Sequence, residues 1–288
     1  MLKPPSMWVR GIRFFREWPV IPGLIIAGMI LMSVLAPVLA PHDPSKPNLR
    51  LRNAPPGWYK QGDWTHPLGT DYIGRDVLSR VLYGARVSLL VAAVALVSGT
   101  VVGTSLGLLA GYLGGHIDEI IMRIVDIWLG LPFLLVALVI VVVVGGSIGV
   151  IIALLALLTW ASFVRNVRAE VLSLKSRDYI SLAKVAGASP IYIMFRHILP
   201  GVLNTVIVIA SLRVGGLILT EASLSFLGAG IPPPTPAWGS MIADGREYLR
   251  DAWWVSTFPG IGIFLLVLAL NFFGDWFRDH FDPRLRQV

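Results

Sequence analysis

The sequence predicts an all-α, polytopic membrane protein with six transmembrane helices. Hydrophobic residues make up 55% of its 288 residues, charged residues only 14%, and the mean hydropathy is +0.73. A soluble domain has about 25% charged residues. The apolar residues also form long runs, such as 129–144, which contains no charge. A hydrocarbon core about 30 Å thick needs about 20 such residues per helix, so these runs indicate membrane insertion.

Six apolar segments are long enough to serve as spans. The first follows a basic N-terminal segment, as a signal peptide would. Its apolar stretch is too long for a signal peptide, and Pro41 follows the possible cleavage point, so we expect it to be retained. The expected spans are residues 20–40, 87–112, 117–144, 148–164, 202–220 and 257–277.

The distribution of Lys and Arg favours cytoplasmic N- and C-termini under the positive-inside rule. The same side chains suit anionic membrane lipid. They form no continuous patch with interleaved aromatic residues, so the net charge of +7 does not indicate nucleic-acid binding. The expected segments are a cytoplasmic tail (1–19), the first transmembrane helix (20–41), an extracytoplasmic segment (42–86), a five-helix core (87–277) with a cytoplasmic loop (165–200), and a cytoplasmic tail (278–288).

Two connecting segments have structure of their own. In the outer segment, Asp76 is placed to cap a short amphipathic helix that includes Val77 and Leu82, which we expect on the membrane surface or over the outer mouth. In the inner segment, we expect two short helices. Gly187 ends the first as a C-cap, and Pro190 begins the second in its first turn.

Glycines follow one face of the second span. Their four-residue spacing allows a neighbouring helix to approach closely. Packing within the chain is the favoured interpretation, and a subunit interface is the alternative. The glycines are Gly99, Gly103, Gly107 and Gly111.

Charged residues inside the spans are rare and therefore candidates for function. Arg123 and Asp126 lie three residues apart on one helix face, so we expect them to pair. Arg213 lies midway along its span, and we expect it to face a polar cavity or an acid on a neighbouring helix. Glu221 lies at the outer end of the same span. Pro132 should kink the third span.

The sequence contains no pattern for catalysis. It has no phosphate-binding loop, no Gly-x-Ser-x-Gly and no cysteine. We therefore expect no enzyme activity and no bound cofactor, and any ATP that drives this protein must be hydrolysed by another chain. The histidines show no metal-ligand spacing, so no metal site is indicated. They are His42, His66, His116, His197 and His280.

The inner segment resembles the EAA loop of permeases in ABC importers. Gly187, Leu199 and Pro200 match that pattern in spacing, and Ala183 matches its second Ala. The sequence departs from the pattern elsewhere, with Ser181-Leu182 in place of Glu-Ala and His197 at an apolar position. The missing Glu removes an ion pair that this side chain usually makes.

Further motifs resemble one branch, the dipeptide, oligopeptide and nickel permeases, and specifically the second of their two paired permease subunits. The resemblance covers about 19–282, nearly the whole chain. The motifs are His66-Pro67-Leu68-Gly69-Thr70-Asp71, Gly74-Arg75-Asp76, Gly114-Gly115-His116-Ile117-Asp118, Thr220–Gly228 and Pro232-Pro233-Pro234 with Trp238-Gly239.

The resemblance implies the type I ABC importer permease fold in a bacterial or archaeal cytoplasmic membrane. The implied partners are a second permease, two ATPase subunits that hold ATP and Mg²⁺, and an extracytoplasmic substrate-binding protein that meets Trp238 and the Pro run. A short helix of the inner loop would dock on an ATPase, and peptide is the favoured substrate. The implied coupling residues are Asp178, Ala183, Ala186, Gly187, Pro190, His197, Leu199 and Pro200.

Two other functions are compatible with some of these features. A solitary secondary transporter or channel would use Arg213 and Pro132 at mid-membrane, but it usually carries an internal repeat, which this sequence lacks. A membrane anchor or assembly factor would explain the glycines but not Arg213.

Overall fold

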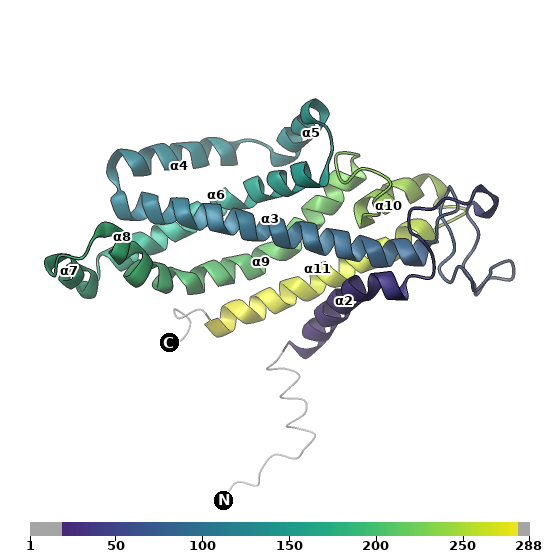
Figure 1. Ribbon diagram of the computed structural model, residues 1–288, viewed down its shortest axis with the longest axis horizontal. Helices are drawn as coiled ribbons and strands as arrows, with labels where there is room; N and C mark the ends of the chain where they lie inside the picture. The colour runs from purple at the N-terminus through teal and green to yellow at the C-terminus, as the bar shows by residue number, and fades with distance from the viewer. Residues whose placement is uncertain (1–18, 282–288) are drawn as a thin grey trace, which may run out of the picture.

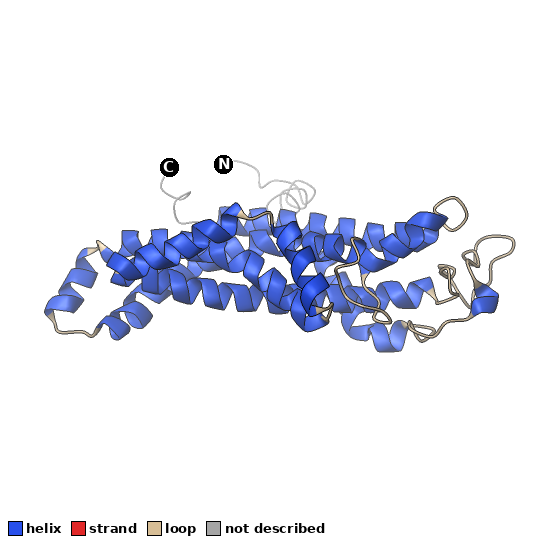
Figure 2. Cartoon of the chain, turned by 90° about the horizontal axis from the view of Figure 1, so that it is seen from above, coloured by secondary structure: helices blue, strands red, loops and turns tan. Residues whose placement is uncertain are grey.

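The computed structural model describes residues 19–281 as an elongated bundle of helices (Figure 1). In this part of the chain no strand occurs, and the all-α prediction is confirmed. Helices run along the long axis, with most loops at the two ends (Figure 2). The elements are α2 Val20–Leu39, η1 Leu49–Leu51, α3 Val77–Leu113, α4 Gly115–Gly130, α5 Phe133–Val144, α6 Ile148–Lys175, α7 Asp178–Val185, α8 Pro190–Ile193, η2 Met194–Ile198, α9 Leu199–Phe226, α10 Trp238–Gly245, η3 Arg246–Tyr248 and α11 Trp254–Phe281.

Five of the described helices, α2, α3, α6, α9 and α11, are long and apolar enough to cross a membrane. Helices α4 and α5 together form a sixth, bent candidate. This arrangement agrees with six spans. Most of the predicted tails at 1–19 and 278–288 lies outside the described residues, although α11 continues to Phe281.

The third predicted span is not one straight helix. It divides into α4 and α5, whose axes differ by 88°. Pro132 is the cause, because it has no backbone N–H and its ring conflicts with the carbonyl of Trp128 one turn earlier. The expected kink at Pro132 is therefore a complete break.

Two predicted boundaries also differ. Asp76 caps its helix as expected, since its side chain accepts a hydrogen bond from the backbone N–H of Ser79. The helix it begins is not a separate surface helix, because no residue breaks the chain before the second span and α3 runs on to Leu113. Similarly, α6 continues into the first part of the predicted inner loop and ends at Lys175.

The glycine face of α3 packs against α6. A Cβ at Gly103 would lie 2.5 Å from the Cβ of Phe163, and one at Gly111 would lie 2.7 Å from the Cβ of Val171. Gly99 and Gly107 face α6 with similarly short separations. The two backbones approach too closely for any larger residue, which confirms packing within the chain.

The two ends of the bundle are built differently. One end holds α7 and α8, joined by a short turn (Figure 1). The other holds residues 41–76, called the cap segment here, together with α10 (Figure 1). Trp238 of α10 belongs to the core: it is 1% exposed and its indole N–H donates to the carbonyl of Val81 at 2.9 Å. The expectation that Trp238 meets a binding protein is therefore wrong.

Candidate functional site

The turn after α7 has the geometry of a Schellman motif, in which two backbone N–H groups cap the last carbonyls of a helix. The N–H of Gly187 donates to Lys184 and that of Ala188 donates to Ala183, both at 3.0 Å. Gly187 has φ +81°, the left-handed conformation that glycine adopts without strain. Ser189 then caps α8 by accepting from the N–H of Tyr192. The predicted helix–turn–helix is present.

Helix α7 is attached to the bundle by few contacts. Ile180 is fully buried in a cluster that includes Tyr112, Val171 and Ile193. Asp178 lies exposed in the first turn of α7, and Ala186 and Gly187 are exposed at its end. Ile180 is thus the main anchor of this short helix.

The remaining apolar side chains around α7 point away from the bundle. Val185 is 87% exposed and Leu182 is 69% exposed. Charged residues, Arg177 and Lys184 among them, lie on the same short helix or beside it, which is unlike a surface buried in lipid. Exposed large apolar side chains gathered on one short helix–turn–helix indicate an interaction site. We call it the α7 patch: Tyr179, Leu182, Val185, Ile191 and Tyr192.

The second half of the EAA-like motif forms a wide turn. Pro200 has no N–H to donate, and the chain compensates with a π-helical stretch at Met194–Ile198, where Leu199 donates to the carbonyl of Met194. His197 is half-buried, with its ring 5.6 Å from that of Tyr192. Leu199 packs against the same cluster as Ile180. These residues brace the loop against α9.

Two of the predicted intramembrane charges meet on one turn of α6. Asp126 pairs with Arg165 at 2.7 Å. Arg213 donates to the hydroxyl of Ser162 at 2.7 Å. All of these except the half-buried Ser162 are exposed on the bundle. We call this surface, formed by α4, α6 and α9, the polar stripe: Asp126, Ser162, Arg165 and Arg213.

The expected partner of Asp126 was wrong. Asp126 pairs across to α6 rather than with Arg123 on its own helix, because the long guanidinium of Arg165 reaches it from the neighbouring helix. Arg213 donates to a serine on an open surface rather than to an acid. The expected polar cavity stays a prediction, since another chain would have to cover this surface to enclose it.

Glu221 is separate from the polar stripe and fully buried between α3 and α9. Its two carboxylate oxygens accept hydrogen bonds from Ser88 at 2.9 Å and Ser225 at 2.8 Å. No Lys or Arg among the described residues pairs with it. The two hydroxyls satisfy the carboxylate, and it connects two helices near the cap.

Sequence reasoning missed a charge network that joins the cap segment to α10. Arg75 pairs with Asp71 at 2.6 Å and with Asp244 at 3.4 Å, and Arg80 lies 3.6 Å from Asp71. Burial raises the pKa of Asp244, although Arg75 and Arg80 oppose this shift. The acidic and basic residues of the cap motif were visible in the sequence, but their partner Asp244 lies 169 residues away from Arg75.

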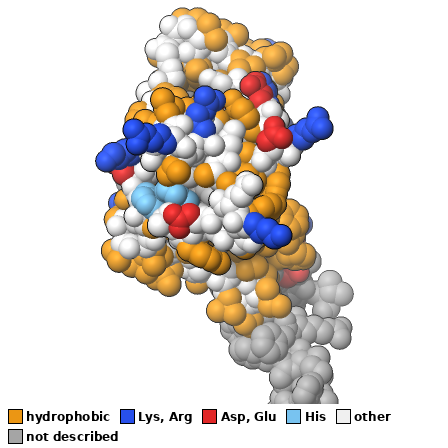
Figure 3. All heavy atoms as spheres, turned by 90° about the vertical axis from the view of Figure 1, so that its right-hand side faces the viewer, with side chains coloured by type: hydrophobic (Ala, Val, Ile, Leu, Met, Phe, Trp, Pro, Cys, Tyr) orange, Lys and Arg blue, Asp and Glu red, His pale blue; other side chains and the backbone are white. Residues whose placement is uncertain are grey.

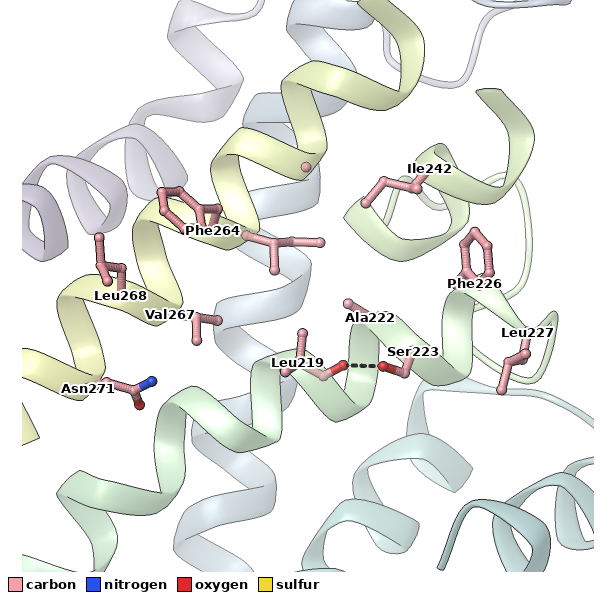
Figure 4. Close-up of a pocket in the computed structure, with 12 residues that line it drawn as sticks. Leu219, Ala222, Ser223, Phe226, Leu227, Ile242, Phe264, Val267, Leu268 and Asn271 are labelled. Atoms are coloured by element: carbon pink, nitrogen blue, oxygen red, sulfur yellow. Dashed lines mark hydrogen bonds between the residues drawn. The ribbon is translucent and has the colours of Figure 1, made fainter. Parts of the chain in front are cut away.

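An open groove of about 620 Å³ lies between α9, α10 and α11. Figure 4 shows Phe264 and Leu268 of α11 on one side, Leu219 and Phe226 of α9 on the other. The hydroxyl of Ser223 already donates to the carbonyl of Leu219 at 2.8 Å. This apolar lining suits a lipid chain or a neighbouring helix, and is unsuited to a charged peptide.

Comparison with known proteins decides the family. Residues 103–287 match the family described as binding-protein-dependent transport system inner membrane component, and residues 6–56 match the N-terminal transmembrane domain of oligopeptide transport permease C. The chain belongs to this family of ABC importer permeases. It is an integral, multi-pass protein of the inner membrane.

Several full-length relatives are similar to this permease. It is 48% identical over 275 residues to the dipeptide transport system permease protein DppC of Escherichia coli, covering 95% of this chain and 92% of that protein. It is 43% identical over 268 residues to the di/tripeptide transport system permease protein DppC of Pseudomonas aeruginosa, covering 92% and 88%.

The fold is shared with a solved transporter. A chain of the MetNI methionine ABC transporter, in an inward-facing conformation, superposes with a TM-score of 0.55 at 21% identity, covering 69% of this permease and 93% of that chain. At this identity the likeness establishes the type I permease fold alone.

Proposed function

We propose that this permease is a membrane subunit of an ATP-driven importer that carries peptides into the cytoplasm. The α7 patch is the observation that carries the ATP-driven part of the proposal. The patch is exposed and apolar and lies at one end of the bundle. The short helix α7 that carries most of it is attached mainly through Ile180. A soluble domain that docks there could transmit a rigid-body movement to α6 and α9.

The proposed partners are supported by the family of binding-protein-dependent permeases to which the chain belongs. The chain has no phosphate-binding loop, so two partner ATPases would bind ATP and Mg²⁺ and press on α7 as they close. A second permease would face this one, and a substrate-binding protein would deliver the solute at the cap end. In this arrangement α7 and both termini are cytoplasmic, in agreement with the distribution of Lys and Arg.

We propose that the polar stripe lines part of the path that the substrate takes across the membrane. Arg213 is exposed halfway along a membrane helix, and a charge left in lipid there would cost several kcal/mol. A second permease that covers this surface would enclose the stripe in a water-accessible passage. The stripe offers both a carboxylate and guanidinium groups, which suit the two charged ends of a peptide.

The peptide substrate is supported by the relatives in Escherichia coli and Pseudomonas aeruginosa, both of which are named as permeases for small peptides. Their likeness to this chain is nearly full-length. We propose di- and tripeptides as the substrate class.

The decisive experiment is to purify the tagged chain at native expression in mild detergent and identify what accompanies it. We expect a second permease and ATPases with phosphate-binding loops, and ATP-dependent uptake of dipeptides by the reconstituted complex with its binding protein. Transport by this chain alone, without ATPases, would instead identify a secondary transporter.

Gly187 provides a sharper test of α7. The space around it is open, since an added Cβ would have no atom of this chain within 4 Å. Asn tolerates the left-handed conformation, whereas Tyr adds backbone strain and bulk at the proposed docking surface. We expect Gly187→Tyr to lose most uptake with normal membrane insertion, and Gly187→Asn to keep most of it. Equal, normal uptake in both would remove the coupling role from this turn.

A further inference from the structure

The fold brings together three residues that are scattered in the sequence. His42 follows α2, His66 lies in the middle of the cap segment, and Asp76 is the N-cap of α3. Their candidate ligand atoms all lie within 4.8 Å of one another. The Nδ1 atoms of His66 and His42 lie 3.0 Å and 4.0 Å from one carboxylate oxygen, Oδ1 of Asp76.

Among the described residues, Asp76 pairs with no guanidinium group, unlike two other acidic residues of this region. Asp71 and Asp244 each pair with a guanidinium group. Asp76 has a fully buried side chain, yet within 19–281 its only ionisable partners are the two histidines. Burial of a carboxylate away from water is unfavourable unless a cation or several hydrogen bonds compensate. Hydrogen bonds from Ser79 and His66 compensate Asp76 without a paired guanidinium, and a cation bound between Oδ1 and the two imidazoles would add a positive charge there.

The second carboxylate oxygen is already held in place. Oδ2 of Asp76 accepts from both the backbone N–H and the hydroxyl of Ser79, at 2.8 Å and 2.7 Å. The same hydroxyl accepts from the backbone N–H of His42 at 3.1 Å. Ser79 thus orients both the acid and one histidine, as outer partners do around a metal site. Oδ1 has no partner on Ser79; it lies within hydrogen-bond distance of Nδ1 of His66, at 3.0 Å, and a metal ion bound between them would replace that contact.

We propose that His42, His66 and Asp76 form a binding site for a divalent transition-metal ion, with Zn²⁺ the best fit. Two imidazoles and one carboxylate are the N and O donors that zinc prefers, with a fourth position open to water. Tetrahedral geometry with bonds of 2.0–2.2 Å places ligand atoms about 3.3 Å apart. Oδ1 and Nδ1 of His66 are near this separation already, at 3.0 Å. Nδ1 of His42 lies 4.0 Å from Oδ1 and its ring is stacked on that of His66, so the His42 ring has to move inward and turn.

The location supports such a movement. The side chain of His42 is 40% exposed, whereas that of His66 is 13% exposed and that of Asp76 is fully buried. Figure 3 shows that histidine side chains reach the surface at this end of the molecule. A metal ion entering from the outer surface would coordinate the fixed carboxylate of Asp76 and would connect the end of α2 to the start of α3. The lack of ligand spacing in the sequence is explained, because each ligand comes from a different part of the fold.

The test uses the complex purified through a tag without histidine and stripped with EDTA. Zn²⁺ binding is measured by titration calorimetry and by metal analysis after dialysis. Tetrahedral Co²⁺ gives a visible absorption band that a merely structural histidine would not produce. We expect the wild-type complex to bind one Zn²⁺ per permease more than the complexes with His42 or His66 replaced. We also expect Zn²⁺, but not Mg²⁺, to raise the Tm of the wild-type complex.

Variants assign the site. We expect His42→Ala and His66→Ala each to weaken Zn²⁺ binding at least about tenfold, since even outer-partner losses cost 10–100-fold. His116→Ala is the matched control, because His116 is 98% exposed on α4 far along the chain, and it should leave binding unchanged. Absence of stoichiometric Zn²⁺ in the folded wild type, or binding that both cap variants retain, would overturn the proposal.

Discussion

Glu221 is a carboxylate inside the bundle that two hydroxyl groups satisfy. A Gln at this position keeps an acceptor for one hydroxyl and a donor for the other, so we expect Glu221→Gln to be mild. Glu221→Leu would strand the hydroxyls of Ser88 and Ser225, at about 1–3 kcal/mol for each group left unsatisfied. Thermal unfolding of the purified complex measures the difference. Ser223→Ala is the control, since that hydroxyl bonds only within its own helix.

The glycines of α3 offer a second prediction for single residues. Gly103→Ala would place a methyl group 2.5 Å from both the Cβ of Phe163 and the carbonyl oxygen of Trp160. Overpacking of this kind costs about 1–3 kcal/mol. Gly216→Ala is the matched control, because no atom lies within 4 Å of its added Cβ. A lower Tm for the Gly103 variant and an unchanged or higher Tm for the Gly216 variant are expected; equal Tm values would contradict the close packing of α3 and α6.

The glycines and the intramembrane charges show what local sequence can predict. The four-residue spacing of the glycines is a property of one helix, so it indicated their shared face and close packing. The partners of Asp126 and Arg213 lie 39 and 51 residues away on α6. No periodicity within a helix reveals which residue of another helix lies opposite, so the partner of Asp126 was predicted wrongly and Ser162 was not predicted as the partner of Arg213.

At the scale of the element, different residues of α7 are expected to provide stability and coupling. Ile180→Ala removes the buried anchor, and we expect it to cost about 2–5 kcal/mol locally and to loosen α7. Val185→Ala changes a side chain that is 87% exposed, so it should leave Tm unchanged. If the α7 patch docks an ATPase, Val185→Ala should nevertheless lower ATPase recovery or uptake. Hydrogen exchange across α7, Tm and co-purification of the ATPases distinguish the two variants. A lower Tm for Val185→Ala with the ATPases still bound would contradict the assignment of the α7 patch as the docking surface.

The helix ends around the inner turn were predicted better than the lengths of the helices. Gly187 and Pro190 act on the residues beside them, so the helix ends around the turn follow from local chemistry. Helix lengths depend on whether anything interrupts the chain. Nothing does between Val77 and Leu113, so one helix replaces two predicted elements, whereas Pro132 interrupts a stretch that was predicted as one span.

Across the whole molecule, the two ends differ in the forces that hold them. The α7 end is held by apolar packing around Ile180 and by the pair of Arg168 with Asp118. The cap end is held by buried charges, with Arg75 joining the cap segment to α10. Composition predicted the spans, but not this division, because the cap network depends on contacts between residues far apart in the chain.

Orientation is a prediction for the whole molecule, and the absence of cysteine makes it simple to test. Gln61 lies exposed in the cap segment and Ser181 lies exposed in α7, so a single cysteine at either position adds one reactive thiol. We expect a membrane-impermeant maleimide to label Gln61→Cys in intact cells, and Ser181→Cys only after permeabilisation. The opposite pattern would place α7 outside, where no ATP-hydrolysing partner could reach it, and would remove the basis for the coupling role.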